Sequence, residues 1–171
     1  MKRAEARVAR AARKRLQDAE KSARLKVTPA SEKTVRLGAD PGSIFGMKMT
    51  WNDERRDCDG SWAWGTPRQW SSAAWDAQIK PKLEEWAKLT WGEIDQLVTG
   101  SSRKRHKMHH SMETRILVED AQQRLVETDN IEEFIFRFRL GNLPRLWGFR
   151  RAGEFHLLWY DPNHEIYPTE V

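Results

Sequence analysis

This chain of 171 residues lacks most of the features that mark membrane, disulfide-bonded and secreted proteins. No apolar run approaches the ~20 residues that a membrane-spanning helix needs. Cys58 is the single cysteine, which excludes an internal disulfide and a cysteine-rich zinc site. The N-terminal residues carry no apolar core of a secretory signal. We therefore predict a cytoplasmic protein that makes no contact with a membrane.

The net positive charge of the chain comes from its N-terminal part. Residues 1–38 carry 12 lysines and arginines against 4 acids, whereas residues 39–171 carry 18 against 21. The first 25 residues favour helix but would be marginal alone in water, and Pro29, Gly38 and Pro41 indicate a linker after them. We predict a basic helical or disordered extension with its linker over 1–42 and a single domain over 43–171. The extension could be a solvated tail, a nucleic-acid contact or a protein contact.

Tryptophan is unusually frequent. The chain has 9, and 7 of them lie between residues 51 and 91. Each tryptophan can bury a large apolar area, so most of them are expected in a compact core. A stacking platform for bases or sugars is the alternative function of this region.

The pattern of apolar residues predicts an α+β fold, with helices packed on one face of a small, mainly antiparallel sheet. Thr66 and Pro67 suit a helix start, Pro81 must kink or split the run that follows to residue 89, and Thr90–Glu93 has the capping-box pattern of a helix to about residue 98. Residues 99–111 are expected to form a basic loop, and 119–128 a short helix. The expected strands cover 44–51, 61–65, 133–140, 145–151, 154–160 and 165–167, of which 133–160 form a C-terminal three-stranded meander.

Arginines alternate with aromatic residues along this meander. Alternation places Arg137 and Arg139 on the side opposite Phe134, Phe136 and Phe138, so the sheet should have one apolar and one cationic face. In the middle strand it places Arg145, Trp147, Phe149 and Arg151 on one face and Leu146 and Arg150 on the other. In the third strand it places Phe155, Leu157 and Trp159 on the expected core face and His156, Leu158 and Tyr160 on the opposite face.

The cationic side of the meander is the first candidate site. Arg137, Arg139, Arg150 and His156 are expected to meet on one surface. A cation there would stabilise charge on a phosphorane, and His or Tyr would assist attack by a 2′-hydroxyl during RNA cleavage. A solvated sheet face is the alternative explanation.

Residues 103–110 combine four lysines and arginines with three histidines. A metal site would need a third ligand and a helical frame, and the neighbouring cations would repel a divalent ion, so we predict no metal and no cofactor. The segment is either a flexible loop that contacts phosphates or a plain solvated loop. The nucleic-acid-binding residues predicted here and on the strands are Arg103, Lys104, Arg105, Lys107, Arg137, Arg139 and Arg151.

The order of helices, meander and short terminal strand is similar to the RelE/HigB/ParE toxin superfamily. The matching segments lie within about residues 119–168: Leu140–Arg150, with its glycine and arginine-bearing strand, Glu154–Asp161 and His164–Tyr167. The resemblance implies a toxin that contacts or cleaves ribosome-bound mRNA and has an antitoxin or other protein partner. The residues it implies for catalysis are Arg145, Arg150, His156, His164 and Tyr167. The slightly acidic body and the tryptophan-rich region 51–91 depart from the family, whose members are strongly basic throughout.

Three functions remain open at this point. One is a RelE-like ribonuclease, and another is a non-catalytic accessory protein that binds nucleic acid or the ribosome. The third is an interaction subunit of a larger bacterial or phage assembly, with tryptophans at its interface. Convergence of Arg137, Arg139, Arg150 and His156 in one concave site would favour the enzyme, and dispersal over a flat face would favour binding.

Overall fold

The computed structural model describes residues 43–100 and 105–168, which all belong to one unit of the chain, Gly42–Val171. The predicted extension over 1–42 and the predicted contacts Arg103 and Lys104 lie outside the described residues. In the described part of the chain, no helix is long and apolar enough to cross a membrane.

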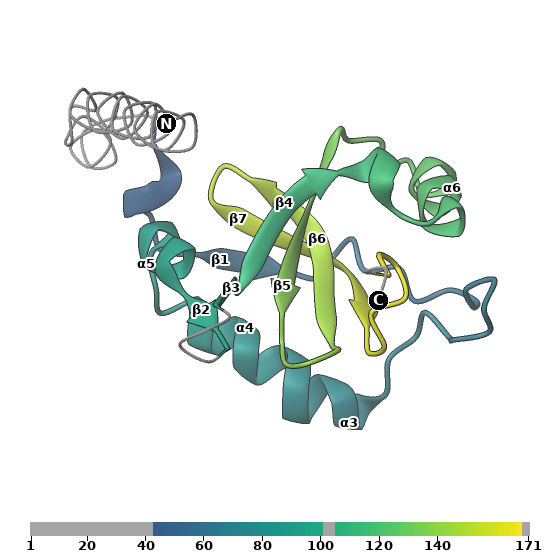
Figure 1. Ribbon diagram of the computed structural model, residues 1–171, viewed down its shortest axis with the longest axis horizontal. Coiled ribbons are helices and arrows are strands. Elements are labelled where there is room, and N and C mark those ends of the chain that lie inside the picture. The colour runs from purple at the N-terminus through teal and green to yellow at the C-terminus, as the bar shows by residue number, and fades with distance from the viewer. Residues whose placement is uncertain (1–42, 101–104, 169–171) are drawn as a thin grey trace, which may run out of the picture. The chain divides into compact units, whose positions relative to one another are not determined.

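A five-stranded sheet forms the centre of the fold (Figure 1). Its strand order is β1 (Thr50–Asn52), β7 (Glu154–Asp161), β6 (Arg145–Arg151), β5 (Phe134–Arg139) and β4 (His109–Glu113). β1 pairs with β7 in parallel, and the other pairs are antiparallel. The α+β class and the C-terminal meander are thereby confirmed, and both meander turns lie where the sequence predicts them.

The segment predicted as a basic loop is largely extended. β2 (Val98–Thr99) pairs with β3 (His106–Lys107), and β4 pairs with β5 over its whole length. The loop prediction over 99–111 was therefore wrong for much of its length. Met108 and Met112 pack against the two apolar cores, which gives this polar segment its place on the sheet.

The helices between β1 and β2 cover one face of the sheet. They are α3 (Ser72–Ala74), a π-helical turn (Trp75–Ile79), α4 (Lys80–Trp86) and α5 (Trp91–Gln96). Figure 1 shows α4 and α5 on the side of the strands away from α6. The core on this face is formed by Met49, Trp70, Ile79, Leu83, Trp86, Trp91, Ile94, Phe136, Phe138, Leu146, Phe155, Leu157 and Tyr160.

The first of these helices begins later than predicted, and the helical run is continuous through Pro81. Its N-cap is Ser71, whose hydroxyl accepts a hydrogen bond from the Ala74 amide at 3.0 Å, so the predicted start at Thr66–Pro67 was wrong. Pro81 does not split the helix. The turn before it is π-helical, with the Lys80 amide bonded to the Trp75 carbonyl, and this shift accommodates the amide that proline lacks.

The predicted capping box of α5 is confirmed. The Glu93 amide donates to the Thr90 hydroxyl at 3.2 Å, and the Thr90 amide donates to the Glu93 carboxylate at 2.7 Å. This cap fixes the start of a helix that buries Trp91 and Ile94 against the sheet.

The opposite face of the sheet is also apolar over much of its area. α6 (Glu119–Glu127) buries Ala121 and Leu125 there, as the predicted 119–128 helix required. The full core is Trp62, Leu117, Ala121, Leu125, Ile135, Trp147, Phe149, Leu158, Trp159 and Ile166. The cationic face expected from the alternation is therefore reduced to the part of the sheet that α6 leaves free.

A β-bulge in β7 changes the predicted faces of its second half. Trp147 pairs with Trp159 and Gly148 with Leu157, so Leu158 is an extra residue. Beyond it, Trp159 faces the α6 side and Tyr160 the other, the reverse of the prediction. Gly148 permits this geometry, because a Cβ there would lie 2.1 Å from the His156 carbonyl oxygen.

Three further predicted strands form only in part or not at all. Residues 44–46 make a 3₁₀ turn, and the strand there is limited to Thr50–Asn52. Residues 61–65 contribute one isolated bridge, Ser61 to Pro67. Residues 165–167 form no strand because the amides of Glu165 and Ile166 bond to the Asp161 carboxylate instead.

Candidate functional site

Three arginines gather on the α6-side face of the sheet, at the end next to the β5–β6 turn. Arg139 and Arg145 stand opposite each other in the β5–β6 register, and Arg137 pairs with Trp147 two positions along. We call these three residues the arginine cluster. Arg137 is 6% exposed and Arg145 is 3% exposed, so two of the three side chains are removed from water.

The arginine cluster has no carboxylate partner. In residues 43–100 and 105–168, none of its three guanidinium groups forms an ion pair with an aspartate or glutamate. Burial lowers the pKa of both Arg137 and Arg145 to about 10, and the charge of Arg139 adds to each shift. A buried charge is normally paired because its desolvation is costly, so this arrangement calls for an explanation.

Neutral groups hold the arginines in place. The Arg137 guanidinium lies over the Trp147 ring at 5.4 Å and the Tyr167 ring at 5.9 Å. Arg145 donates from Nη1 to the carbonyls of Gly141 and Pro144, at 3.1 and 2.9 Å, and from Nη2 to that of Asn142 at 3.0 Å.

Part of the donor capacity of the cluster is unused. Within the described part of the chain, the buried Nε atoms of Arg139 and Arg145 have no hydrogen-bond partner. Aromatic rings and carbonyl dipoles orient the guanidinium groups without neutralising their charge.

Two histidines adjoin the arginine cluster. His110 on β4 pairs with Arg137 in the sheet register, and His164 lies in the turn after β7. The pKa of each is lowered to about 4, first by burial and then by arginine charges, chiefly those of Arg137 for His110 and of Arg145 for His164. Both imidazoles are therefore neutral at pH 7.

The tautomer of His164 follows from its contact with Arg137. Arg137 Nη1 lies 3.1 Å from His164 Nε2, and a guanidinium can only donate. Nε2 is therefore the acceptor, and the ring proton is on Nδ1. The one basic nitrogen of His164 is thus engaged by Arg137, and it can take up a proton only when that contact is given up.

The structure brings together five of the residues predicted from sequence and separates the rest. Those it gathers are Arg137, Arg139, Arg145, His164 and Tyr167. Those it places elsewhere are Arg105, Lys107, Arg150, Arg151 and His156, while Arg103 and Lys104 lie outside the described residues.

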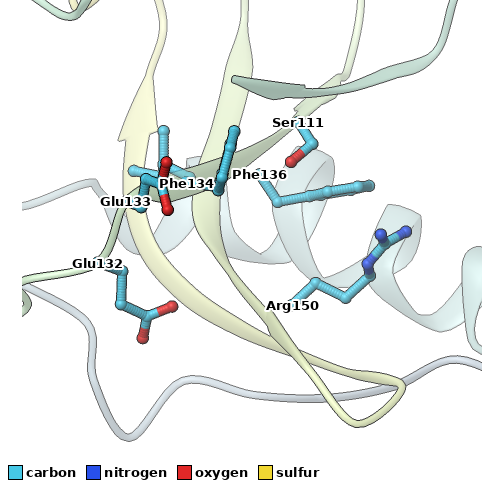
Figure 2. Close-up of a pocket in the computed structure, with 7 residues that line it drawn as sticks. Ser111, Glu132, Glu133, Phe134, Phe136 and Arg150 are labelled. Carbon is cyan, nitrogen blue, oxygen red and sulfur yellow. The ribbon is translucent and has the colours of Figure 1, made fainter. Parts of the chain in front are cut away.

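Arg150 lies on the other face of the sheet, so its predicted meeting with Arg137 and Arg139 was wrong. Its guanidinium is 5.1 Å from the Trp91 ring and 5.0 Å from that of Phe136. It borders a pocket of about 380 Å³, in which Figure 2 shows Arg150 and Phe136 on one side and Glu132 on the other. Arg150 follows Phe149 in β6, and adjacent strand residues point to opposite faces.

His156 lies near the start of β7, at the end of the strand away from the arginine cluster, so it was also wrongly grouped with Arg137 and Arg139. Its Nδ1 is 3.1 Å from Asn52 Nδ2, and its Nε2 is 3.4 Å from the Glu154 carboxylate. Phe149, its partner in the register, is covered by the α6 core. His156 therefore binds the end of β1 to β7.

The remaining predicted contacts have acidic partners or stand apart. Arg151 forms an ion pair with Glu132, and Lys107 lies 3.0 Å from Asp95. Arg105 is exposed at the start of the described segment that leads into β3. These cations are balanced or solvated, unlike those of the arginine cluster.

Sequence reasoning missed His110, Trp147 and Asp161 as parts of this site. His110 was interpreted as part of a basic loop, and only its long-range pairing with β5 brings it to Arg137. Asp161 lies just beyond the predicted strand 154–160, yet it is 3% exposed and bonds to the turn that carries His164. An aspartate directly after an apolar strand was the available signal.

A comparison with known proteins finds no matching family model, no matching curated protein and no matching solved structure.

Proposed function

We propose that the arginine cluster binds a phosphodiester group of RNA and that the chain acts there as a RelE-like ribonuclease. The observation that carries this proposal is the burial of Arg137 and Arg145 without a carboxylate among the described residues. A phosphodiester is a suitable counter-charge because it offers several acceptor oxygens to guanidinium donors in fixed geometry.

The surrounding groups suit cleavage by internal attack. The 2′-hydroxyl of the RNA would give its proton to the neutral imidazole of His110, or to His164 Nε2 once the Arg137 guanidinium turns from it to the phosphate, while its oxygen bonds to phosphorus. The arginines would stabilise the extra charge on the non-bridging oxygens. The P–O5′ bond would then break, and the 5′-oxygen would take up the proton from the imidazolium. The products are a 2′,3′-cyclic phosphate and a free 5′-hydroxyl.

The partners of such an activity follow the resemblance drawn from residues 119–168. They are ribosome-bound mRNA as substrate, an antitoxin or other protein as regulator, and the cytoplasm as location. Arg150 and His156, which that resemblance also implied for catalysis, are left out of the proposed mechanism because neither adjoins the cluster.

Expression in a bacterial host tests the proposal. The wild-type chain should arrest growth and leave mRNA fragments with 2′,3′-cyclic phosphate ends. Arg139→Gln should relieve the arrest by weakening phosphate binding, and His164→Gln should relieve it by removing a proton acceptor. Arg115→Gln is the matched control because Arg115 is exposed and paired with Glu113. Normal growth and intact RNA in cells that contain abundant, folded wild-type protein would argue against the enzyme.

A non-catalytic RNA-binding protein is the second candidate, and two observations favour it. Arg150 and His156 do not converge with Arg137 and Arg139, and such dispersal is the outcome expected of a binding surface. With pKa values of about 4, neither His110 nor His164 can supply a proton at neutral pH before a ligand binds. This candidate predicts salt-dependent binding without cleavage. Replacing Arg139 should lower the slope of log K against log salt by roughly 0.7, the value for one phosphate contact on a single strand. RNA fragments released by the pure protein would contradict it.

A further inference from the structure

The turn after β7 brings His164 and Tyr167 to the arginine cluster, although it belongs to no strand or helix. His164 has a backbone φ of +62°, a left-handed conformation that a non-glycine residue adopts only at a cost. A short turn of this kind needs a fixed anchor if its side chains are to meet Arg137 in one geometry.

Asp161 provides such an anchor at the end of β7. Its Oδ1 accepts a hydrogen bond from the Glu165 amide at 2.9 Å, and its Oδ2 accepts one from the Ile166 amide at 3.1 Å. These two amides lie between His164 and Tyr167 in the chain. One side chain thereby holds two successive peptide groups, 164–165 and 165–166, that lie between the two site residues.

The same carboxylate also orients the ring beneath Arg137. Asp161 Oδ2 lies 3.3 Å from Trp147 Nε1, and the Arg137 guanidinium stands 5.4 Å from the centre of that tryptophan ring. Asp161 therefore contacts both the turn that contains His164 and the Trp147 ring over which the Arg137 guanidinium lies.

The charge of Asp161 assists the arginines without occupying their donors. Burial raises the pKa of this carboxyl, and the hydrogen bonds from Glu165 and Ile166 act against that rise. Both carboxylate oxygens already accept bonds, and neither forms one with an arginine. Its negative charge nevertheless favours the charged forms of Arg137 and Arg145. Asp161 thus leaves the guanidinium donors to a ligand.

We infer that Asp161 is the positioning residue of this site, setting the geometry of His164, Tyr167 and Arg137 without contacting the ligand itself. The inference about ligand binding rests on the proposed function, whereas the inference about geometry does not. If Asp161 fixes this turn, the His164 ring keeps one tautomer and a lowered pKa in the free protein, and both can be measured there.

The test compares wild type, Asp161→Asn and Glu154→Gln by NMR of the histidine ring nitrogens in the full chain. Asparagine keeps the size of the side chain but offers an NH₂ group to one of the two amides. In Asp161→Asn, His164 should lose its fixed Nδ1–H tautomer, and its pKa should rise from about 4 towards the ordinary value of 6.5. Glu154→Gln, at the other end of β7, should leave both unchanged.

A short single-stranded RNA then serves as the probe for binding. Asp161→Asn should bind it about tenfold more weakly, the effect of losing roughly one good hydrogen bond in the site. An unchanged His164 spectrum in folded Asp161→Asn would overturn the positioning role. If the spectrum changes but wild type binds no RNA, the proposed function fails and the positioning role stands.

A measurement on wild type covers the case in which Asp161→Asn does not fold. The amides of Glu165 and Ile166 should exchange with solvent deuterium much more slowly than the neighbouring amide of Asn163, because Asp161 holds them. Fast exchange at both positions would show that the carboxylate does not hold the turn, and the inference would be overturned.

Discussion

Two arginine sites in this molecule differ in burial and in the presence of a paired acid. Arg124 donates from Nε and Nη2 to the Asp57 carboxylate at 2.8 and 2.7 Å, and the Trp159 indole donates to the same group at 3.0 Å. The arginine cluster has aromatic rings, carbonyls and histidines around it, and no acid paired with it among the described residues.

The direction of the pKa shifts records this difference. Burial raises the pKa of Asp57, but the bonds from Arg124 and Trp159 outweigh it and the net pKa is lowered. The bond to Asp57 raises the pKa of Arg124, whereas burial lowers those of Arg137 and Arg145. Asp57 and Arg124 therefore stabilise each other's charged forms, and their contact links α6 to the loop after β1. The arginine cluster, in contrast, has its charged forms disfavoured by burial and has no paired carboxylate among the described residues.

Removing the acid of the paired group should have the largest effect. Asp57→Ala should lower the free energy of unfolding by about 3 kcal/mol, because it leaves Arg124 half-buried without its main partner and Trp159 without an acceptor. Asp53→Ala is the matched control, since its pair with Arg56 is exposed and worth at most about 1 kcal/mol. Denaturant unfolding measures both. Equal losses of stability in the two variants would show that the Asp57–Arg124 pair contributes no more to the fold than an exposed ion pair.

Lowering the pH should destabilise the fold through the two histidines beside the arginine cluster. His110 and His164 have folded pKa values of about 4 against an ordinary 6.5, so the unfolded chain binds more protons between these limits. Their contribution to stability is complete above pH 6.5 and is lost as pH falls towards 4. The double variant His110→Gln/His164→Gln should show a flatter pH dependence of the unfolding midpoint over this range.

A bound anion should reverse this effect, because its negative charge raises the pKa of both histidines. RNA binding near pH 5.5 should therefore take up protons. Calorimetry in two buffers with different ionisation enthalpies measures this uptake. Identical heats in both buffers would show that the histidines do not respond to the ligand.

The strands of this site were predictable because their alternation is strong. Arg137 and Arg139, which alternate with Phe136, Phe138 and Leu140, specify both the strand and its faces, and the observed β5 agrees. The bulge at Leu158 was not predictable from periodicity, because His156 to Tyr160 offers apolar residues to either face. Gly148 was the one local signal, as a position where another backbone approaches closely.

The membership of the site was only partly predictable, because closeness in sequence differs from closeness in a sheet. Arg150 and His156 are near Arg145 in sequence. Arg150, however, points to the opposite face of the sheet, and His156 lies near the end of β7 that is away from the arginine cluster. His110 joins the site through pairing across 27 residues of chain, from β4 to Arg137 on β5. Its local sequence, two histidines and a serine, carries no pattern that predicts a strand.

The smallest effect should have a sign opposite to that of Asp57→Ala. Arg139→Gln removes one of three neighbouring positive charges and an Nε that has no partner in the described residues. It should raise the free energy of unfolding by about 0.5 to 1 kcal/mol through relief of repulsion, while weakening RNA binding. Arg115→Gln, at an exposed arginine paired with Glu113, should change neither property. A loss of stability in Arg139→Gln would mean that this arginine holds the fold as Arg124 does. A gain of stability with a loss of binding is the combination expected of a charge that is kept for its ligand.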